Sequence, residues 1–429
     1  MSQLIFEGAH PLSGVLQPSG DKSISHRALL FGAISSGISR YSGFLASEDC
    51  LCTLEALRQM GVSIHHDSIT QAIEIHGVGM RGLQQPCADL DMGNSGTAMR
   101  LMLGLLAGQN FSAILFGDAS LSSRPMKRVT EPLKQMGAQI KGADKANFAP
   151  LTIQGGKLKG IEYLNKLRSA QVKSAILLAG LYADGVTRVI EDVPSRDHTE
   201  KFLLAAGACF RQQGGNIEVQ KTESLRALSG RIPGDISSAA FFIVGASLTK
   251  GSDVTIKNVG LNSTRTGLID VLRRMGANIE IKIENEIPEP IGTIRVRGGK
   301  LCGTRVTRDE VPALIDEIPV LMVAMSLAEG ESLVSGAEEL RVKETDRILA
   351  MVTNLKKAGA EIEELADGCV VMGIESLKGA EIDSFGDHRI AMSFAIASLA
   401  SKGPMRILNT DCIATSYPEF VSHFKLLAK

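Results

Sequence analysis

The sequence predicts an α/β protein of two similar domains, each built from three copies of one structural unit. A short glycine-containing word returns six times along the 429 residues, at intervals of 68 to 78 residues. After each word come a strand-like segment, an apolar helical run and an amphipathic helical run. With 44% hydrophobic but only 4% aromatic residues and no Trp, the composition suits a core of Leu, Ile and Ala.

The repeated word is Leu or Met, then any residue, then Gly, and it occupies residues 12–14, 80–82, 158–160, 228–230, 301–303 and 377–379. The amphipathic helix of a unit ends in a second word, as in 57–61 and 133–137, whose final glycine predicts a helix C-cap. Alternating β-branched residues follow, as in 277–283, and predict strands. The predicted unit is therefore strand, apolar helix, amphipathic helix and strands.

The two halves of the chain also resemble each other, since residues 12–23 match residues 228–237. This match places hinges near Gly20 and Gly234. We expect residues 21–233 to form one domain with repeats 1 to 3. Residues 1–20 plus 234–429 should form the other domain, in which the N-terminal strand completes repeats 4 to 6. A chain of this length is too long for one ordinary core.

Composition and charge exclude several classes of function. The 46 Lys and Arg against 47 Asp and Glu leave a net charge of −1, so no global basic surface calls for nucleic acid or membrane. The seven cysteines are scattered without a Cys-x-x-Cys pair, and no histidine spacing indicates a metal site. The longest apolar run, 318–328, is too short for a bilayer, and the N-terminus shows no signal segment. We expect a soluble cytoplasmic protein without metal or cofactor.

The first helix of each unit is apolar nearly all round, so we expect it to be buried with its N-terminus left for chemistry. The clearest N-terminus is 93–100, where glycines let a ligand approach the free backbone N–H groups. An ordinary capped helix is the alternative for this stretch taken alone. If the repeats are arranged alike, six positive helix ends face a cleft between the domains and attract a ligand with several negative charges. These N-termini lie at 22–23, 95–97, 169–171, 235–237, 316–317 and 387–389.

Cationic residues cluster at or near these helix starts. Residues 21–27 contain Lys22, whose ammonium is a mobile point charge, and Arg27, whose guanidinium is a rigid fork. The two side chains suit phosphate and carboxylate ligands. A solvent-exposed basic turn is the alternative. In 341–347, Lys343 and Arg347 lie four residues apart with Glu344 beside them, and a salt-bridged helix surface is the alternative. The remaining candidates, each weak alone, are Arg124 before a proline, Arg196 beside a possible cap at Asp197, and His388, which suits a structural role.

Residues 93–100 and 341–348 resemble the two signature segments of the 5-enolpyruvylshikimate-3-phosphate (EPSP) synthase family, enolpyruvyl transferases of the shikimate pathway. Residues 22–27, Arg124, 169–171, Asp316 and 387–389 follow in matching order, so the resemblance spans nearly the whole chain. It implies two domains of three βαβαββ units each, an inside-out α/β barrel, joined by a two-strand hinge. It also implies transfer of the enolpyruvyl group of phosphoenolpyruvate to the 5-hydroxyl of shikimate 3-phosphate, with release of phosphate.

The resemblance assigns roles to particular residues. For shikimate 3-phosphate it implies Lys22, Ser23, Arg27, Ser169, Ala170, Gln171, Arg196, Asp316 and Lys343. For phosphoenolpyruvate it implies Lys22, Gly96, Arg124, Gln171, Arg347, His388 and Arg389. Asp316 would take the proton of the attacking hydroxyl, and either Glu344 or Lys22 would protonate the enol methylene. The implied partners are these two substrates and glyphosate as an inhibitor, acting on a monomer whose cleft closes on shikimate 3-phosphate.

Two positions depart from the family pattern. Ala170 replaces a second serine, as in the class II branch, where Arg196 is a reasonable substitute. Thr415 stands where other members place a phosphoenolpyruvate-binding lysine, so that contact is absent or supplied elsewhere. Glycine at position 96 leaves room for glyphosate, which an alanine would disfavour.

Two other readings compete with this one. The related family that acts on UDP-N-acetylglucosamine carries a reactive cysteine in the loop matching 117–124, and this chain has none there. A non-catalytic repeat scaffold that binds anions or nucleic acid predicts a broad basic stripe. Such a scaffold does not need the carboxylates of Asp316 and Glu344 among its cations.

Overall fold

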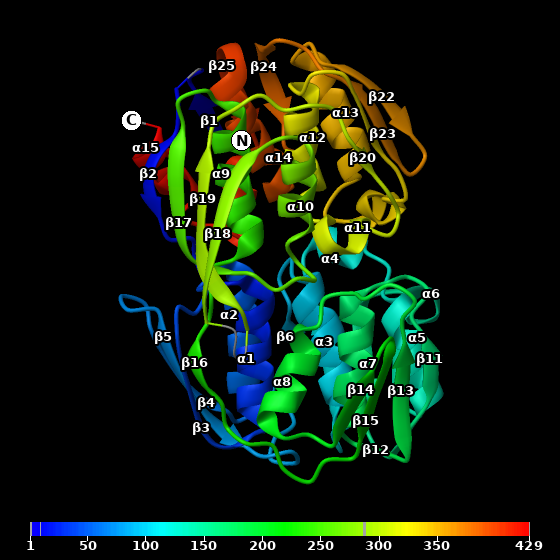
Figure 1. Ribbon diagram of the computed structural model, residues 1–429. Coiled ribbons are helices and arrows are strands. Elements are labelled where there is room, and N and C mark those ends of the chain that lie inside the picture. Colours follow the sequence, from blue (N-terminus) through cyan, green and yellow to red (C-terminus); the bar gives the residue numbers. More distant parts are fainter. Residues whose placement is uncertain (1, 9, 286–288, 429) are drawn as a thin grey trace. The chain divides into compact units, whose positions relative to one another are not determined.

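The computed structural model describes residues 2–8, 10–285 and 289–428. The chain divides into two compact units, of which unit 1 is Met1–Ser19 with Pro233–Lys429 and unit 2 is Gly20–Ile232. Each unit has its own continuous hydrophobic core, as expected of a domain. Figure 1 draws unit 2 in blue to green and the greater part of unit 1 in green to red.

Repeats 1 to 5 each contribute a four-stranded sheet with one shared strand order, and repeat 6 contributes a three-stranded sheet. In the four-stranded sheets the first strand pairs parallel with the strand after the first helix, and an antiparallel hairpin lies beside that strand. The short strands β10(Leu158–Lys159) and β12(Ala183–Asp184) pair in a separate two-stranded sheet. In unit 2 the sheets are β16(Ser229–Arg231)-β3(Ser36–Ser42)-β5(Ala72–Val78)-β4(Ser63–Asp67), β6(Leu90–Asp91)-β7(Ser112–Phe116)-β9(Phe148–Gln154)-β8(Gln139–Gly142) and β11(Glu162–Leu164)-β13(Val186–Ile190)-β15(Asn216–Gln220)-β14(Phe210–Gln213). In unit 1 they are β2(Ser13–Leu16)-β17(Asp253–Gly260)-β19(Ile291–Arg297)-β18(Asn278–Asn285), β20(Arg305–Val306)-β21(Glu331–Val334)-β23(Gly368–Met372)-β22(Glu361–Leu365) and β24(Leu377–Asp383)-β25(Ser401–Leu408)-β1(Gln3–Phe6).

The N-terminal strands complete sheets of unit 1. β1 pairs antiparallel with β25, where it supplies the strand that repeat 6 does not form after its second helix. β2 precedes the first helix in sequence but pairs with β17, whereas β16, more than 200 residues later, pairs with β3. Repeats 1 and 4 thus obtain their first strands from distant parts of the chain.

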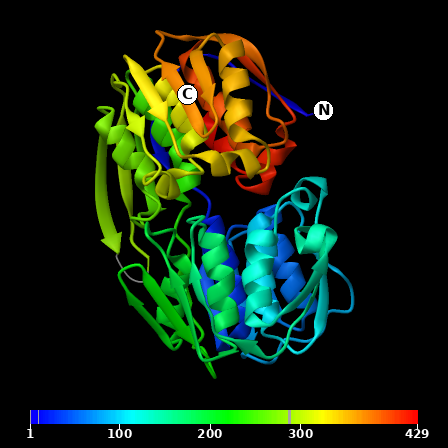
Figure 2. The ribbon, with the colours of Figure 1, turned by 90° about the vertical axis from the view of Figure 1, so that its right-hand side faces the viewer.

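The first helix of each repeat is buried, as its apolar sequence predicts. These helices are α1(Lys22–Ile34), α3(Gly96–Ala107), α7(Ala170–Gly180), α9(Ile236–Leu248), α12(Ile318–Ser326) and α14(His388–Ala397). Within unit 2, α3 contacts both α1 and α7, and the three run side by side (Figures 1 and 2). A Cβ on Gly104 of α3 would lie 2.4 Å from the carbonyl oxygen of Ala175 in α7, so only glycine permits this close packing.

The second helix of each repeat is amphipathic, and its apolar stripe packs against a sheet of the same compact unit. These helices are α2(Glu48–Gln59), α5(Lys127–Met136), α8(His198–Ala206), α10(Gly267–Arg274), α13(Arg347–Lys357) and α15(Phe420–Leu427). In α5, Val129, Leu133 and Met136 are buried. Gly137 and Gly207 cap α5 and α8 with φ of +112° and +76°, which confirms the glycine caps predicted from the repeated words.

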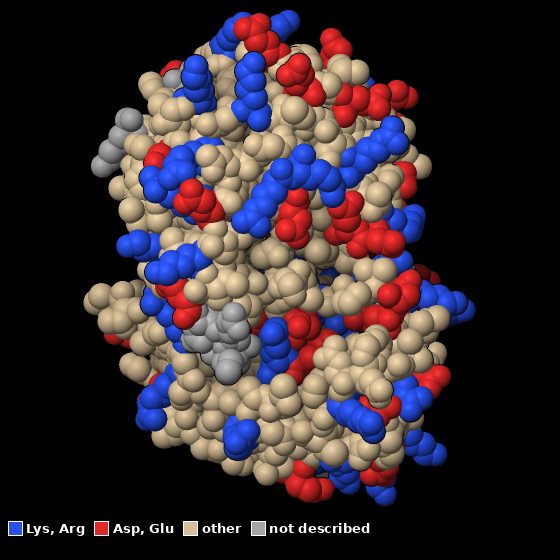
Figure 3. Space-filling model, in the orientation of Figure 1, with Lys and Arg blue, Asp and Glu red and all other residues tan. Residues whose placement is uncertain are grey.

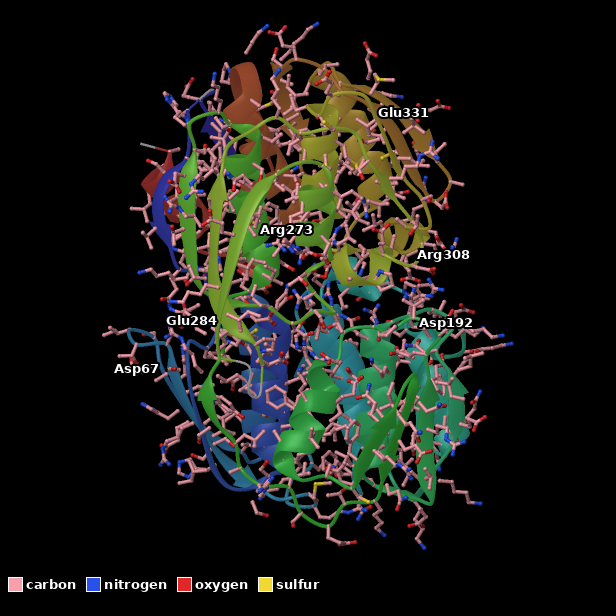
Figure 4. All side chains as sticks on the ribbon, viewed as in Figure 1. Asp67, Asp192, Arg273, Glu284, Arg308 and Glu331 are labelled. Atoms are coloured by element: carbon pink, nitrogen blue, oxygen red, sulfur yellow. The ribbon has the colours of Figure 1, made fainter. Side chains whose placement is uncertain are left out.

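Charged side chains of both signs are scattered over the face drawn in Figure 3, between larger areas of other residues. Many of them form surface ion pairs, such as Arg308 with Glu338, whose Nη1 and Oε1 atoms lie 2.6 Å apart. Figure 4 labels Arg308 at the edge of unit 1, close to the short helix α11(Val311–Leu314). Every helix within the described ranges is shorter or less apolar than a bilayer crossing requires.

Candidate active site

The first helices of unit 2 bring their N-termini together. Gln171, at the start of α7, donates from Nε2 to Thr97 Oγ1 of α3 over 2.8 Å. His26 of α1 lies 3.4 Å from the hydroxyl of Ser95, the N-cap of α3. Because each helix N-terminus carries partial positive charge, this convergence favours a bound anion.

Arg27 is a rigidly held cation of unit 2. Its side chain is only 3% exposed. Nε donates to Thr199 Oγ1 and Nη2 to Ser174 Oγ, both over 2.7 Å, and Nη1 donates to the backbone oxygen of Ser23 over 2.9 Å. These contacts fix the guanidinium beside the first turn of α1, next to Ser23.

Lys22 and His26 share the N-terminus of α1 but carry different charges. Lys22 Nζ lies 2.9 Å from Asp49 Oδ2, and its side chain is partly exposed. Burial, with the positive charges of Lys22 and Arg27 nearby, lowers the pKa of His26 from 6.5 to about 3. His26 is therefore neutral at pH 7, and its Nδ1 pairs with Thr53 Oγ1 over 2.8 Å.

Gly96 is the first residue of α3, and two guanidinium groups approach it. The turn before it is formed by Gly93, whose φ is +54°, and by Ser95, whose hydroxyl caps the helix. A Cβ placed on Gly96 would lie 2.8 Å from Arg100 Nη1 and 3.3 Å from Arg124 Nη1. The absence of a side chain therefore keeps open the space next to both cations.

Amide and hydroxyl oxygens contribute to orienting Arg124 and Arg100. Nη2 of Arg124 donates to Asn94 Oδ1 and to Ser120 Oγ. Arg100 Nη1 donates to Gln171 Oε1 over 2.5 Å. Sequence reasoning named Arg124 and Gln171 but missed Arg100, although Arg100 lies one helical turn after Gly96, a spacing that signals proximity.

Ser169 and Arg196 lie in the two loops that precede α7 and α8. Ser169 is the N-cap of α7, but its hydroxyl makes no capping hydrogen bond, and Ala170 follows as the first helical residue. Arg196 is half-buried directly before α8. Asp197 is the N-cap residue of α8, as the alternative of a helix cap expected, although its side chain makes no capping hydrogen bond.

Arg347 is the centre of a buried charge network in unit 1. It is 1% exposed and donates from Nε to Asp387 Oδ2 and from Nη2 to Glu344 Oε2, both over 2.7 Å. Nη1 donates to Asp316 Oδ1 over 3.3 Å. Burial alone would lower the pKa of Arg347, but these three carboxylates raise it above its ordinary value.

Further cations surround the carboxylate of Asp316. Lys343 Nζ and Arg389 Nε each lie 3.9 Å from Asp316 Oδ1, and Arg389 Nη1 donates to the backbone oxygen of Asp316 over 3.0 Å. Burial, with Arg347 close by, lowers the pKa of Lys343 although Asp316 opposes this shift. Unit 1 therefore places one carboxylate among three cationic side chains.

The segment from 338 to 347 is not the single helix surface that sequence reasoning kept as an alternative. A 3₁₀ turn, η1(Glu338–Val342), ends before Lys343, and α13 begins only at Arg347. Lys343 and Glu344 thus lie in the connecting loop. Since Arg347 is buried, the interpretation of this motif as an exposed salt-bridged helix face is wrong.

His388 is buried at the start of α14 with Thr415 beside it. Its Nδ1 lies 3.4 Å from Thr415 Oγ1, which itself donates to the backbone oxygen of Cys412. The preceding N-cap, Asp387, accepts from the N–H of Arg389 as well as from Arg347. Thr415 therefore lies beside His388, a predicted site residue. Being a threonine, it does not supply the positive charge of the lysine that the family pattern places there.

Sequence reasoning assigned no role to Glu317, which is 1% exposed. Ser237, from the N-terminus of α9, donates to Glu317 Oε1, and Arg265 Nη2 donates to Ser237 Oγ over 2.8 Å. Glu317 Oε1 also lies 4.0 Å from Arg389 Nη1. The only signal in the sequence was the place of Glu317 beside Asp316 at a helix start.

The sequence-predicted residues thus form two groups. The unit 2 cluster contains Lys22, Ser23, Arg27, Gly96, Arg124, Ser169, Ala170, Gln171 and Arg196 together with Arg100, and the unit 1 cluster contains Asp316, Lys343, Glu344, Arg347, Asp387, His388 and Arg389. Over the described ranges, His, Cys, Asp and Glu do not gather in any group of three or more that could hold a metal ion.

Comparison with known proteins places these clusters in a family. The family model for EPSP synthase (3-phosphoshikimate 1-carboxyvinyltransferase) matches residues 6–424. The 3-phosphoshikimate 1-carboxyvinyltransferases of Citrifermentans bemidjiense and Geobacter sp. strain M21 are 52% and 51% identical, over 96% and 98% of this chain and equal shares of theirs. A solved EPSP synthase from Acinetobacter baumannii has a TM-score of 0.87 at 45% identity, covering 99% of this chain and 98% of that one. The chain therefore belongs to the EPSP synthase family.

Proposed function

We propose that the unit 2 and unit 1 clusters together carry out the family's reaction. The chain transfers the enolpyruvyl group of phosphoenolpyruvate to the 5-hydroxyl of shikimate 3-phosphate and releases phosphate, a step of aromatic amino acid biosynthesis. The observation that carries the residue assignment is the position of Asp316, a carboxylate within 4 Å of Lys343, Arg347 and Arg389. A base among cations suits a reaction that deprotonates a hydroxyl beside anionic groups.

The substrates bring two phosphates and two carboxylates, which explains the number of cations in a nearly neutral chain. Ser23 and Arg27 bind the carboxylate of shikimate 3-phosphate, and its 3-phosphate is bound by Ser169, Arg196 and Lys343. The other residues that contact this substrate are Lys22, Ala170, Gln171 and Asp316. Phosphoenolpyruvate is bound by Lys22, the backbone at Gly96, Arg124, Gln171, Arg347, His388 and Arg389.

The chemistry is an addition followed by an elimination. The 5-hydroxyl oxygen forms a bond to C2 of phosphoenolpyruvate, its proton passes to Asp316, and C3 gains a proton. Loss of a proton from C3 then restores the double bond as the C2 to phosphate bond breaks. Arg124 and Arg347 stabilise the charge on the leaving phosphate.

Either Glu344 or Lys22 exchanges the proton at C3. Glu344 is 19% exposed beside Arg347, and Lys22 is 16% exposed beside Asp49, so both have access to solvent for proton exchange. Incorporation of deuterium into C3 in D₂O separates the two. With both variants saturated with substrates, the variant of the true acid, Glu344→Gln or Lys22→Met, loses this exchange, while the other variant retains it.

Shikimate 3-phosphate contacts residues of both units in this assignment, since Arg27 belongs to unit 2 and Lys343 to unit 1. We propose that its binding draws the two units of a monomer together. Small-angle scattering should show a smaller radius of gyration on addition of shikimate 3-phosphate, and sedimentation should show one chain before and after. No compaction would contradict the proposed bridging.

The reaction is tested by phosphate release from the purified protein with phosphoenolpyruvate and either shikimate 3-phosphate or UDP-N-acetylglucosamine. We expect release with shikimate 3-phosphate alone. Release with the nucleotide sugar, or silence with both acceptors in a folded protein, would contradict the proposed function.

A further inference from the structure

A buried carboxylate in unit 2, that of Glu191, joins two loops that the proposed function assigns to one phosphate group. Glu191 follows β13, and its side chain is 2% exposed. Asn165 Nδ2 and Ser195 Oγ donate to Oε1 over 2.7 and 2.6 Å, and Lys173 Nζ and Ser195 N donate to Oε2 over 2.8 and 3.1 Å. Each carboxylate oxygen thus accepts two hydrogen bonds, which orients the group completely.

One arm of this network reaches Ser169. Asn165 is fully buried, and its Nδ2 donates to the backbone oxygen of Ser169 over 3.2 Å. Its Oδ1 accepts from the backbone N–H of Ser169 over 3.3 Å. The amide of Asn165 therefore binds both polar groups of the Ser169 backbone, while Glu191 holds the amide in place.

The second arm reaches Arg196. Ser195, the residue before Arg196, is bound to Glu191 through both its backbone N–H and its hydroxyl. Its carbonyl accepts from Lys173 Nζ over 3.2 Å. Every polar group of Ser195 is thus used, so the backbone leading into Arg196 is fixed.

Lys173 ties the network to two helices. It lies in α7, is 1% exposed, and its Nζ lies 2.6 Å from Glu200 Oε1 of α8 as well as 2.8 Å from Glu191 Oε2. By contrast, the next residue along the chain, Asp192, is labelled at the outer edge of unit 2 in Figure 4 and pairs with Arg168 at the surface. The buried contacts, not the surface pair, connect both loops to both helices.

We propose that Glu191 is a positioning residue for the 3-phosphate of shikimate 3-phosphate, because it fixes Ser169 and Arg196 relative to each other before the substrate binds. This inference rests on the proposed function. Glu191 itself touches no substrate in this account. Preorganised donors need no reordering on binding, so loss of the network weakens binding of the phosphate specifically.

The test compares binding of shikimate 3-phosphate with that of shikimate, which lacks the phosphate, by calorimetry on Glu191→Gln. The amide turns one acceptor into a donor, which faces either Asn165 and the Ser195 hydroxyl or Lys173 and the Ser195 backbone N–H. We expect the Kd for shikimate 3-phosphate to rise about tenfold or more, the usual cost of a lost charged hydrogen bond. The Kd for shikimate should change less than about twofold, because the phosphate contacts are absent from it.

The matched control is Glu218→Gln. Glu218 lies in β15, beside β13, and pairs with Arg188 over 2.8 Å, so the same chemical change is made in the same sheet without contact to either loop. This variant should bind both ligands as the wild type does. The wild-type kcat should also persist in Glu191→Gln at saturating substrate, within about threefold, since the reacting groups are unaltered.

Unchanged binding of shikimate 3-phosphate by Glu191→Gln, or an equal loss for both ligands, would overturn the inference. If this variant does not fold, Asn165→Ala and Ser195→Ala remove one arm each. Either should raise the Kd for shikimate 3-phosphate by about threefold or more without affecting shikimate, as expected for one hydrogen bond, and wild-type values in both would overturn the inference. A wild-type protein that binds shikimate 3-phosphate but releases no phosphate refutes the proposed function instead.

Discussion

Different kinds of acceptor group contribute to holding arginines in the two clusters. In the unit 2 cluster, Arg27, Arg100 and Arg124 donate to hydroxyl, amide and carbonyl oxygens. In the unit 1 cluster, Arg347 donates to the carboxylates of Asp316, Glu344 and Asp387. Neutral acceptors orient a guanidinium without cancelling its charge, whereas carboxylates share that charge.

This difference indicates a division of work. In the proposed function the unit 2 cluster contributes chiefly to binding, and hydroxyl and amide groups help to orient its arginines. In the proposed function the unit 1 cluster also binds anions, but it supplies carboxylates that can accept or deliver a proton. Each of the following predictions tests one side of that contrast.

The largest effect is expected from Arg347→Leu. The change leaves Asp387, which is fully buried, without its cation, and loss of one partner of a buried pair costs about 3 to 5 kcal/mol. Urea unfolding measures this loss. The control, Arg308→Leu, breaks the exposed pair with Glu338 and should cost less than about 1 kcal/mol. Equal losses of unfolding free energy in the two variants would contradict the central role of Arg347 in the buried charge network.

Glu344→Gln should act on turnover more than on folding. The amide retains the shape and one acceptor for Arg347 but cannot exchange a proton, so kcat should fall by about 10² to 10⁴. Steady-state phosphate release measures kcat, and thermal unfolding shows whether the fold is intact. Glu338→Gln, a surface change nearby, serves as control. A kcat within about twofold of wild type would transfer the proton role to Lys22.

Gly96→Ala, a change in the unit 2 cluster, should weaken the binding of glyphosate more than that of phosphoenolpyruvate. The new methyl group would lie 2.8 Å from Arg100 Nη1 and 3.3 Å from Arg124 Nη1, so both guanidinium groups must shift. We expect glyphosate to compete with phosphoenolpyruvate in the wild type. Its inhibition constant should rise about tenfold or more in the variant, as overpacking of about 1 to 3 kcal/mol implies. Identical inhibition constants would refute this placement of the inhibitor.

The smallest effect concerns His26 and pH. Its pKa is lowered from 6.5 in the unfolded chain to about 3 in the fold, so only the unfolded chain takes up a proton between these values. Stability therefore falls as the pH drops from 6.5 toward 3, by up to about 1.4 kcal/mol per pH unit. His26→Gln should show a shallower fall in urea unfolding between pH 6.5 and 5. Parallel curves for the two proteins would contradict a neutral, buried His26.

The repeats made the fold accessible from sequence, because helix periodicity and glycine caps such as Gly137 are local signals. The match between the two halves of the chain assigned the N-terminal segment to the domain of repeats 4 to 6. The strands with which β2 and β16 pair were not visible, since strand pairing over about 200 residues leaves no local trace. The loop at Lys343 and Glu344 was open to misreading as helix, because four-residue spacing fits both.

The positions of Gly96 and Arg389 at helix starts could be predicted, because the motif and the helix signal coincide. Arg100 and Glu317 could not be assigned, because their contacts come from other repeats, through Gln171 and Ser237. Glu191 was equally hidden, since an acidic residue at a strand end looks like a surface residue until Asn165, Lys173 and Ser195 are seen around it.

The central claim, that the carboxylate of Asp316 performs chemistry in a cluster of cations, is tested most directly by Asp316→Asn. Binding of shikimate 3-phosphate by calorimetry and phosphate release should be measured on one preparation. We predict a Kd within about tenfold of wild type and a kcat lower by about 10² or more, because the amide cannot accept the proton of the attacking hydroxyl. An unchanged kcat, or a kcat that falls only as far as binding does, would contradict the account.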